Sequence, residues 1–220
     1  MPFKMKKVLA IHIWCFIVTI ANAQSVTSDE YWSIANERAG KIAAALNITD
    51  STKFYKVKEL IAKEYVAIKE IDERKVNALT AIKTNIADKN EAEIEKTRIT
   101  TLFEQERALI NKQFVAALST EVSPEQIEQI KNGMTYNVLP ITYKGYLEMI
   151  PRLTEEEREY IYAALVEARE HAMAAGSSKE KHEWFGKYKG RINNFLSARG
   201  YDMNKESKDW QERIKQQNLN

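Results

Sequence analysis

Residues 51–87 read STKFYKVKELIAKEYVAIKEIDERKVNALTAIKTNIA and lie within a longer stretch, 41–123, that contains no glycine and no proline. The apolar side chains of this segment recur at steps of three and four residues, which places them on one face of an α-helix. A helix of roughly 30 or more residues is about 45–55 Å long. The pattern therefore predicts one long amphipathic helix, whose apolar positions are Phe54, Val57, Leu60, Ile61, Ile68, Ile71, Leu79, Ile82 and Ile86.

A second apolar series with the same spacing follows the first. A polar cluster near residues 87–90 separates the two, and a connection this short predicts an antiparallel helical hairpin. An earlier helix, at about residues 28–46, is expected to pack at the base of that hairpin. The second series consists of Ile99, Leu102, Phe103, Leu109, Ile110, Phe114 and Leu118.

The C-terminal half shows clear start and stop signals for shorter helices. Ser123-Pro124 begins one that Gly133 ends, and the capping box Thr154-Glu155-Glu156-Glu157 begins another that stops at Gly176. Residues 177–180 begin a further helix, which ends at Gly200. Sustained alternation typical of strands is absent from the sequence. We predict an all-α fold in which a long antiparallel helical hairpin packs with a bundle of shorter C-terminal helices.

The first 23 residues have the features of a signal peptide. Three lysines precede an apolar run from Val8 to Ile20, and Ala21-Asn22-Ala23 is a small-residue cleavage site. The apolar run is shorter than the roughly 20 residues needed to span a membrane. We expect cleavage after Ala23 and a periplasmic or secreted protein without a stable membrane anchor. Residues 24–220 would form one all-α domain, with a long-helix part (28–119) and an aromatic- and glycine-rich part (123–217).

Charge and cysteine content exclude several classes of function. The whole chain has 33 basic and 31 acidic residues, and three of the lysines belong to the predicted signal peptide, so the remainder has a formal charge of −1. No polybasic stretch remains, which argues against nucleic acid as a partner. The single cysteine, Cys15, also lies in the predicted signal peptide. The remainder of the chain therefore has no disulfide, no thiol nucleophile and no thiolate metal ligand. Two histidines without a metal-binding motif do not predict a zinc site, and we expect no metal or cofactor.

The helix predicted over residues 179–199 contains two glycines four residues apart, Gly186 and Gly190. Each interior glycine costs a helix roughly 1 kcal/mol relative to alanine. Both fall on the polar face, and their neighbours there could bind a ligand that lies against the backbone. A close crossing by another helix, or a local kink, is the alternative explanation of the pair and is slightly favoured. The polar neighbours are His182, Lys187, Lys189, Asn193 and Asn194.

Arg169 lies in the middle of the apolar face of the helix predicted to begin at the capping box. A buried guanidinium needs an anionic partner, because desolvating it alone is prohibitive. That partner is either an internal glutamate or the carboxylate of a ligand held by two hydrogen bonds. We favour the internal pair. His171 lies on the opposite face with Glu167 and Glu170, which by default is a solvated face.

The segment between the hairpin and these helices reads MTYNVLPITYKGYLEMIP, residues 134–151. Because it contains two prolines and a glycine, we interpret it as irregular backbone. Tyrosines in such a segment either fill a core or form stacking surfaces with a polar tip. Tyr136, Tyr143 and Lys144 are therefore included among the candidate ligand-binding residues.

This segment and EAREHAMAAGSSKEKHEWFGKYKGRINNFLSARGYD, residues 167–202, resemble the most characteristic stretches of a family of exported bacterial proteins, domain of unknown function 3826. The resemblance extends from about Tyr31 to Trp210. The ANAQ ending of the signal peptide is similar to that of exported Bacteroidetes proteins. The resemblance implies a role in systems that break down plant or algal polysaccharides. It assigns no catalytic residues.

Three hypotheses about function follow. The first is an exported protein that binds a carbohydrate, including acidic oligosaccharides, around residues 136–146 and 182–194. The second is an enzyme acting on such a saccharide, with His171, His182, Tyr143 and Lys187 as acid–base candidates and Arg169 neutralising a carboxylate. The third is a helical chaperone or scaffold, which the long charged hairpin suggests. Three helix starts also resemble the Leu-Thr-x-x-Gln motifs of Spy-like periplasmic chaperones, although ordinary helix capping is the favoured explanation of these starts. Those starts lie at residues 46–50, 118–126 and 153–156.

Overall fold

The structure, a computed structural model, describes residues 28–217, and every element in that range is a helix. The first four are α1 (Ser28–Ala44), α2 (Ser51–Asn85), α3 (Lys89–Ser119) and α4 (Pro124–Met134). The last four are α5 (Val138–Met149), α6 (Glu155–Met173), α7 (Ser178–Ala198) and α8 (Met203–Gln217). The predicted all-α fold is confirmed. The predicted signal peptide lies outside the described residues.

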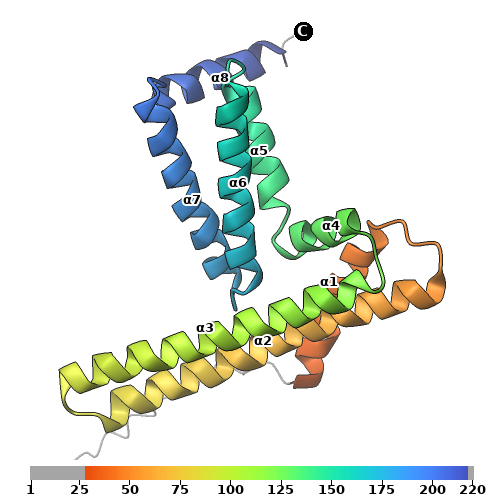
Figure 1. Cartoon of the computed structure of the whole chain (residues 1–220), viewed down its shortest axis with the longest axis vertical. Helices are drawn as coiled ribbons and strands as arrows, with labels where there is room; N and C mark the ends of the chain where they lie inside the picture. The colour runs from red at the N-terminus through yellow and green to blue at the C-terminus, as the bar shows by residue number, and fades with distance from the viewer. Residues whose placement is uncertain (1–27, 218–220) are drawn as a thin grey trace, which may run out of the picture.

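The long hairpin is also confirmed. Helices α2 and α3 contain 35 and 31 residues and are joined by residues 86–88. Asp88 begins α3 by accepting hydrogen bonds from the backbone N–H groups of Asn90 and Glu91, at 2.9 and 2.8 Å. Figure 1 shows the hairpin at one end of the molecule, with α5, α6 and α7 standing across it and α8 at the far end.

Two hydrophobic cores stabilise these two parts. The first joins α1, the first half of α2, the end of α3 and α4 around Ile61, Leu118 and Ile130. The predicted packing of the first helix at the base of the hairpin is therefore correct. The second core joins α5, α6 and α7 around Leu165 and Phe185. Met173, at the end of α6, belongs to the first core and links the two.

The predicted caps begin the C-terminal helices. Ser123 and Gln126 form a reciprocal capping box at α4, and Thr154 and Glu157 form another at α6. Ser177 caps α7 by accepting a hydrogen bond from the Glu180 N–H at 3.1 Å. Helix α6 ends at Met173, three residues before the predicted stop, because Ala174 and its successors turn to meet the hairpin.

The interpretation of residues 134–151 as irregular backbone is wrong. Residues 138–149 form α5, and Pro140 is tolerated because it lies in the first turn, where the N–H groups have no partner within the helix. The irregular part is the turn before it, where Tyr136 and Asn137 have φ angles of 59° and 55°. This left-handed conformation is uncommon outside glycine.

The turn between α6 and α7 approaches the hairpin closely at Gly176. A Cβ atom added there would lie 2.6 Å from Cγ of Asp72 on α2 and 2.9 Å from Nη2 of Arg107 on α3. Real Cβ atoms essentially never show contacts below 3.0 Å. Only glycine therefore allows the turn to meet the Asp72–Arg107 ion pair without displacing it.

We expect Gly176→Ala to lower the free energy of unfolding by about 1–3 kcal/mol, because the added methyl group overpacks this contact. Gly186→Ala is the matched control. No atom of the described part of the chain lies within 4 Å of a Cβ added at Gly186, so this substitution should be neutral or stabilise α7 by up to ~1 kcal/mol. Denaturant unfolding of both variants measures the difference. Equal stability would contradict the close approach.

Candidate functional site

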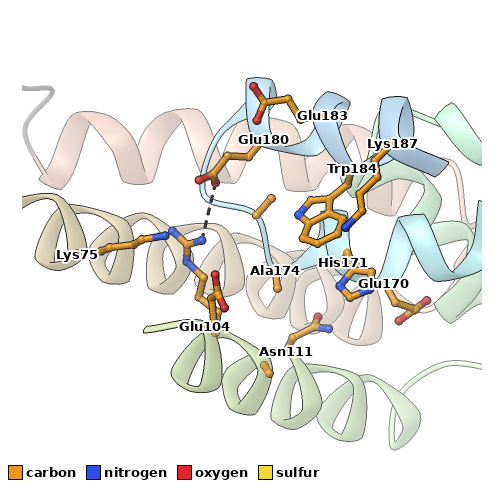
Figure 2. A pocket seen from close by; sticks show the side chains of 13 residues that line it. Lys75, Glu104, Asn111, Glu170, His171, Ala174, Glu180, Glu183, Trp184 and Lys187 are labelled. Carbon is orange, nitrogen blue, oxygen red and sulfur yellow. Dashed lines mark ion pairs between the residues drawn. The ribbon is translucent and has the colours of Figure 1, made fainter. Parts of the chain in front are cut away.

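A cleft of about 650 Å³ lies where the α6–α7 turn meets the hairpin. Its size is in the range of small-molecule sites, and residues from α2, α3, α6 and α7 surround it. Figure 2 shows Asn111 on one side, from α3, and Trp184 and Lys187 on the other, from α7. The lining residues are Lys75, Glu104, Arg107, Ala108, Asn111, Glu170, His171, Ala174, Ala175, Glu180, Glu183, Trp184 and Lys187.

Arg107 holds the hairpin side of the cleft. Its side chain is buried and forms an ion pair with Asp72 across the hairpin. Nη1 of Arg107 also lies 3.8 Å from Oε2 of Glu180 on α7, the pair that is dashed in Figure 2. The same Glu180 oxygen accepts a hydrogen bond from the Gly176 N–H at 2.8 Å. Arg107 and Glu180 thus fix the beginning of α7 against both helices of the hairpin.

Aromatic rings form the opposite side of the cleft. The ring of His171, on α6, stacks on Trp184, on α7, with 4.2 Å between centroids and 12° between planes. Nζ of Lys187 lies 4.9 Å from the Trp184 ring centroid, within cation–π distance. Because Lys187 is exposed, a ligand can displace its flexible chain and contact the indole.

The charges around the cleft are mixed. Lys75, Arg107 and Lys187 contribute positive charge, while four glutamates contribute negative charge. Of the glutamates, Glu180 contacts Arg107, and Glu170 pairs with Lys131 at 3.1 Å and with Arg169. Carboxylates and amide oxygens accept hydrogen bonds, whereas lysines and arginines donate them. The lining suits a neutral ligand with many hydroxyl groups better than an anion.

Arg169 has internal partners, as the favoured interpretation expects. Its side chain is almost fully buried, and Nη2 lies 2.6 Å from Glu128 of α4 and 2.9 Å from Glu170. Nη1 donates to Oδ1 of Asn132 at 2.9 Å. This network joins α4 to α6, and hence the first core to the second. Arg169 is not among the described residues that line the cleft, so its guanidinium is not placed to hold the carboxylate of a ligand bound there.

We expect Arg169→Met to lower the free energy of unfolding by about 1–3 kcal/mol. This loss is smaller than that caused by breaking a fully buried ion pair, because the partners Glu128 and Glu170 are 45% and 40% exposed. Adding Glu128→Gln should recover part of the loss, since one uncompensated carboxylate is removed. Arg158→Met, on the same helix, is the control. Urea unfolding measures all four proteins. If Arg169→Met alone is as stable as the wild-type protein, the structural role of Arg169 is contradicted.

Of the ten residues predicted from the sequence, only His171 and Lys187 line the cleft. Tyr136 and His182 meet elsewhere and stack with 5.4 Å between centroids, and Tyr143 contacts Tyr162. Lys144 pairs with Glu148 on the exposed side of α5. Lys189 and Asn194 are exposed on α7, while Asn193 accepts a hydrogen bond from the Tyr146 hydroxyl at 2.7 Å.

The explanation of the glycine pair by a crossing helix is wrong. Among residues 28–217 nothing lies within 4 Å of a Cβ added at Gly186 or Gly190, so no described element uses the space. The two glycines lie on an open, exposed face of a helix that continues from Ser178 to Ala198. A ligand lying along that face would have contacts on one side only.

Most of the cleft could not be recognised from the sequence. By its spacing Trp184 falls on the same apolar face of its helix as Phe185 and Tyr188, which predicts core packing. Asn111 and Glu104 lie among many polar residues of a long charged helix. The one available signal was Arg107, which falls near the apolar stripe between Phe103 and Ile110. Such an arginine requires a buried anionic partner, as Arg169 does, and it marks the place where another element meets the hairpin.

A second polar cluster lies between α2 and the beginning of α7. Nζ of the buried Lys181 donates to the Met134 carbonyl at 3.3 Å. Glu64, also buried, has an oxygen, Oε1, without a hydrogen-bond partner among residues 28–217. Burial raises the pKa of Glu64 to about 7, although the positive charge of Lys181 opposes this shift. Burial likewise lowers the pKa of Lys181 to about 8, against the effect of Glu64.

The raised pKa of Glu64 predicts a pH-dependent stability. The folded protein holds this proton more tightly than the unfolded chain, so the contribution of Glu64 to stability falls as pH rises from about 4.5 to about 7. We expect Glu64→Gln, which stays neutral, to gain about 2–3 kcal/mol relative to wild type across this interval. Glu70→Gln, an exposed position on α2, is the control. Urea unfolding at pH 5 and pH 7.5 gives the difference, and a constant difference would refute the shift.

Residues 33–216 match the family described as "Protein of unknown function (DUF3826)". The chain belongs to this family. The match covers all the elements that form the cleft, so the DUF3826 region contains the whole candidate site. A search of curated proteins found no match.

Within residues 28–217, no helix is long and apolar enough to cross a membrane. No group of three or more histidine, cysteine or acidic side chains in this range is placed to hold a metal ion.

Proposed function

We propose that this protein is exported and binds a carbohydrate in the cleft between the hairpin and the α6–α7 turn. The observation that carries the proposal is the stacked pair His171–Trp184 beside a row of hydrogen-bonding side chains. Carbohydrates present apolar C–H faces that contact aromatic rings, and hydroxyl groups that both donate and accept. A cleft that offers an indole, carboxylates, an amide and cationic donors complements both features.

The charges favour a neutral saccharide over an acidic one. Arg169, the residue expected to hold a ligand carboxylate, is committed to Glu128, Asn132 and Glu170. Four glutamates line the cleft and would repel an anion. The proposed ligand is therefore a neutral oligosaccharide, with the acidic class as the comparison that tests the choice.

The same glutamates support a second candidate, an enzyme that hydrolyses the bound saccharide. Glycoside hydrolysis commonly uses two carboxyl groups on either side of the scissile bond. Product analysis after prolonged incubation with any oligosaccharide that binds distinguishes the enzyme from a binding protein.

The chaperone hypothesis depends on a different region, the distal hairpin, where Val76, Ile94 and Leu102 are 56%, 70% and 47% exposed.

Thermal unfolding in the presence of neutral and acidic plant and algal oligosaccharides tests the proposal, because a ligand of the native state raises Tm. We expect at least one neutral oligosaccharide to raise Tm of the wild-type protein. Trp184→Ala should weaken its binding by about 1–3 kcal/mol, roughly 5- to 150-fold, because the stacking surface is lost. Trp32→Ala, at a 39% exposed tryptophan on α1, is the control and should bind as wild type does.

Three results would contradict the proposal. The first is the absence of any shift in Tm across the panel. The second is binding that Trp184→Ala leaves unchanged, which would place the ligand elsewhere. The third is chaperone activity at the distal hairpin. In that case the protein would suppress aggregation of a denatured test protein, Trp184→Ala would leave this suppression unchanged, and Ile94→Ser would abolish it.

A further inference from the structure

A cluster of aromatic and basic side chains lies where the beginning of α7 and the α4–α5 turn meet α2. Nζ of Lys181, on α7, lies 5.9 Å from the ring centroid of Tyr65, on α2. The next residue, His182, stacks on Tyr136 of the turn, with 5.4 Å between ring centroids. None of these four residues lines the cleft. The cluster is therefore separate from the proposed carbohydrate site.

Helix α1 adds Tyr31 to this cluster. Nζ of Lys69, one turn after Tyr65 on α2, lies 5.9 Å from the Tyr31 ring centroid. Burial raises the pKa of Tyr31 and that of Tyr65, and Tyr136 adds to both rises. Because electrostatic effects of this kind weaken with distance, the three phenol groups lie near one another.

The three phenol hydroxyl groups are unpaired but accessible. No residue of the described range forms a hydrogen bond with the hydroxyl group of Tyr31, Tyr65 or Tyr136. Tyr31 and Tyr65 are partly buried, yet their hydroxyl oxygens are not among the unpaired atoms that the described chain encloses. Tyr136 is 46% exposed. A ligand can therefore contact these hydroxyl groups.

Arg38 brings a positive charge without a counter-ion to the same place. It lies seven positions after Tyr31, on the same face of α1. Its exposed side chain forms no ion pair and no hydrogen bond with the described residues. Burial lowers the pKa of Lys181 to about 8, against the effect of Glu64, and the charge of Arg38 adds to this lowering. Arg38 also opposes the rise that burial causes in the pKa of Tyr31 and of Tyr65. Its guanidinium thus lies near an ammonium group and phenols, and no described carboxylate pairs with it.

The position of Tyr136 depends on an uncommon backbone conformation. Its φ angle is 59° and that of Asn137 is 55°, both in the left-handed region. Residues other than glycine are unfavourable in this region, and such residues cluster at functional sites. The side chain of Asn137 does not cap α5, so helix capping does not account for the turn. The turn places the exposed ring of Tyr136 beside His182.

The cluster offers hydrogen-bond donors and positive charge. A guanidinium group donates several hydrogen bonds and accepts none, and a phenol hydroxyl group can donate one. The complementary ligand group is an oxyanion, which accepts several hydrogen bonds at once. A carboxylate or sulfate group fits the planar fork of an arginine through two parallel hydrogen bonds. An exposed tyrosine ring nearby suits the apolar face of a sugar that carries such a group.

We propose that Arg38 and the hydroxyl groups of Tyr31, Tyr65 and Tyr136 form a second binding site, which takes the carboxylate or sulfate group of an acidic saccharide. Arg38 pairs with the anion, the hydroxyl groups donate to it, and the ring of Tyr136 contacts the sugar. This site goes beyond the proposed function, because it shares no residue with the cleft and takes the opposite class of saccharide. Tyr136 and His182, two of the candidate ligand-binding residues from the sequence, meet at this site.

Two substitutions each remove one part of the site. Arg38→Met removes the cation, and Tyr136→Phe removes a hydroxyl group but keeps the ring. The matched controls are Arg98→Met, at an exposed arginine on the distal part of α3, and Tyr55→Phe, at a 64% exposed tyrosine on α2. The probes are the uronic-acid and sulfated oligosaccharides of the panel above, each with its neutral counterpart. Titration calorimetry gives the affinities.

We expect the wild-type protein to bind a uronic-acid or a sulfated oligosaccharide, and the class that binds more tightly identifies the anion. Arg38→Met should weaken this binding about 10-fold or more, because hydrogen bonds to a charged group are lost. Tyr136→Phe should weaken it about 2- to 10-fold, and the two controls should leave it unchanged. Trp184→Ala should also leave it unchanged, although the same substitution weakens binding of a neutral oligosaccharide in the cleft.

The unliganded variants provide a further measurement. Because Arg38 has no partner among the described residues and lies near Lys181, Tm of Arg38→Met should equal or exceed that of the wild-type protein. If Tm falls instead, Arg38 has an internal role. The site then stands only if Tyr136→Phe, with an unchanged Tm, weakens binding of the acidic oligosaccharide.

Three results would overturn the second site. The first is the absence of binding by every acidic oligosaccharide, and the second is binding that Arg38→Met leaves unchanged. The third is acidic binding that Trp184→Ala weakens and Tyr136→Phe does not, which would place the acidic sugar in the cleft. If neutral oligosaccharides fail to bind while the acidic ones behave as expected, the proposed function fails and the second site stands.

Discussion

The arrangement of this protein depends on the contact between the α6–α7 turn and the Asp72–Arg107 ion pair. That pair lies where the hairpin leaves the first core: every residue from Asp72 to Glu106, all of them within the described part, is at least partly exposed. The turn can reach it only because Gly176 has no side chain. Glu180 then adds a second carboxylate to Arg107, and its position fixes where α7 begins. The cleft is the space left beside this contact.

The contacts that join the hairpin part to the C-terminal helices are largely polar. Arg169 connects α6 to α4 through Glu128 and Asn132, Lys181 connects α7 to the Met134 carbonyl, and Arg107 connects α3 to α2 and α7. Apolar packing stabilises each core, whereas directional hydrogen bonds and ion pairs fix how the two cores sit relative to each other. Buried polar groups add less net stability than apolar ones, but breaking one partner is costly, so they favour a single arrangement.

A cleft between two rigid parts that are joined by specific polar contacts is largely preformed, and a preformed site loses less entropy when a ligand binds. The stacked His171–Trp184 pair comes from two helices of the second core, and Asn111 and Arg107 come from the hairpin. A ligand that touches both sides would therefore bind the two parts together and stabilise the whole fold.

Local sequence patterns specify the helices of this protein. Periodic apolar residues between 51 and 118, without glycine or proline, specify two long helices, and Ser123, Thr154 and Ser177 specify where later helices begin, because these signals act within a few residues of the chain. The sequence also indicated that Arg169 needs an anionic partner, and it favoured an internal glutamate over a ligand carboxylate. It failed at residues 138–149, where proline and glycine suggested irregular backbone, although proline in a first turn is compatible with a helix. The cleft, by contrast, forms only through tertiary contacts. Residues far apart in the sequence, such as Lys75, Asn111, His171 and Trp184, meet only when the α6–α7 turn docks on the hairpin. That docking depends on Gly176 and on the partner of Arg107, two contacts between distant segments that local sequence patterns do not encode.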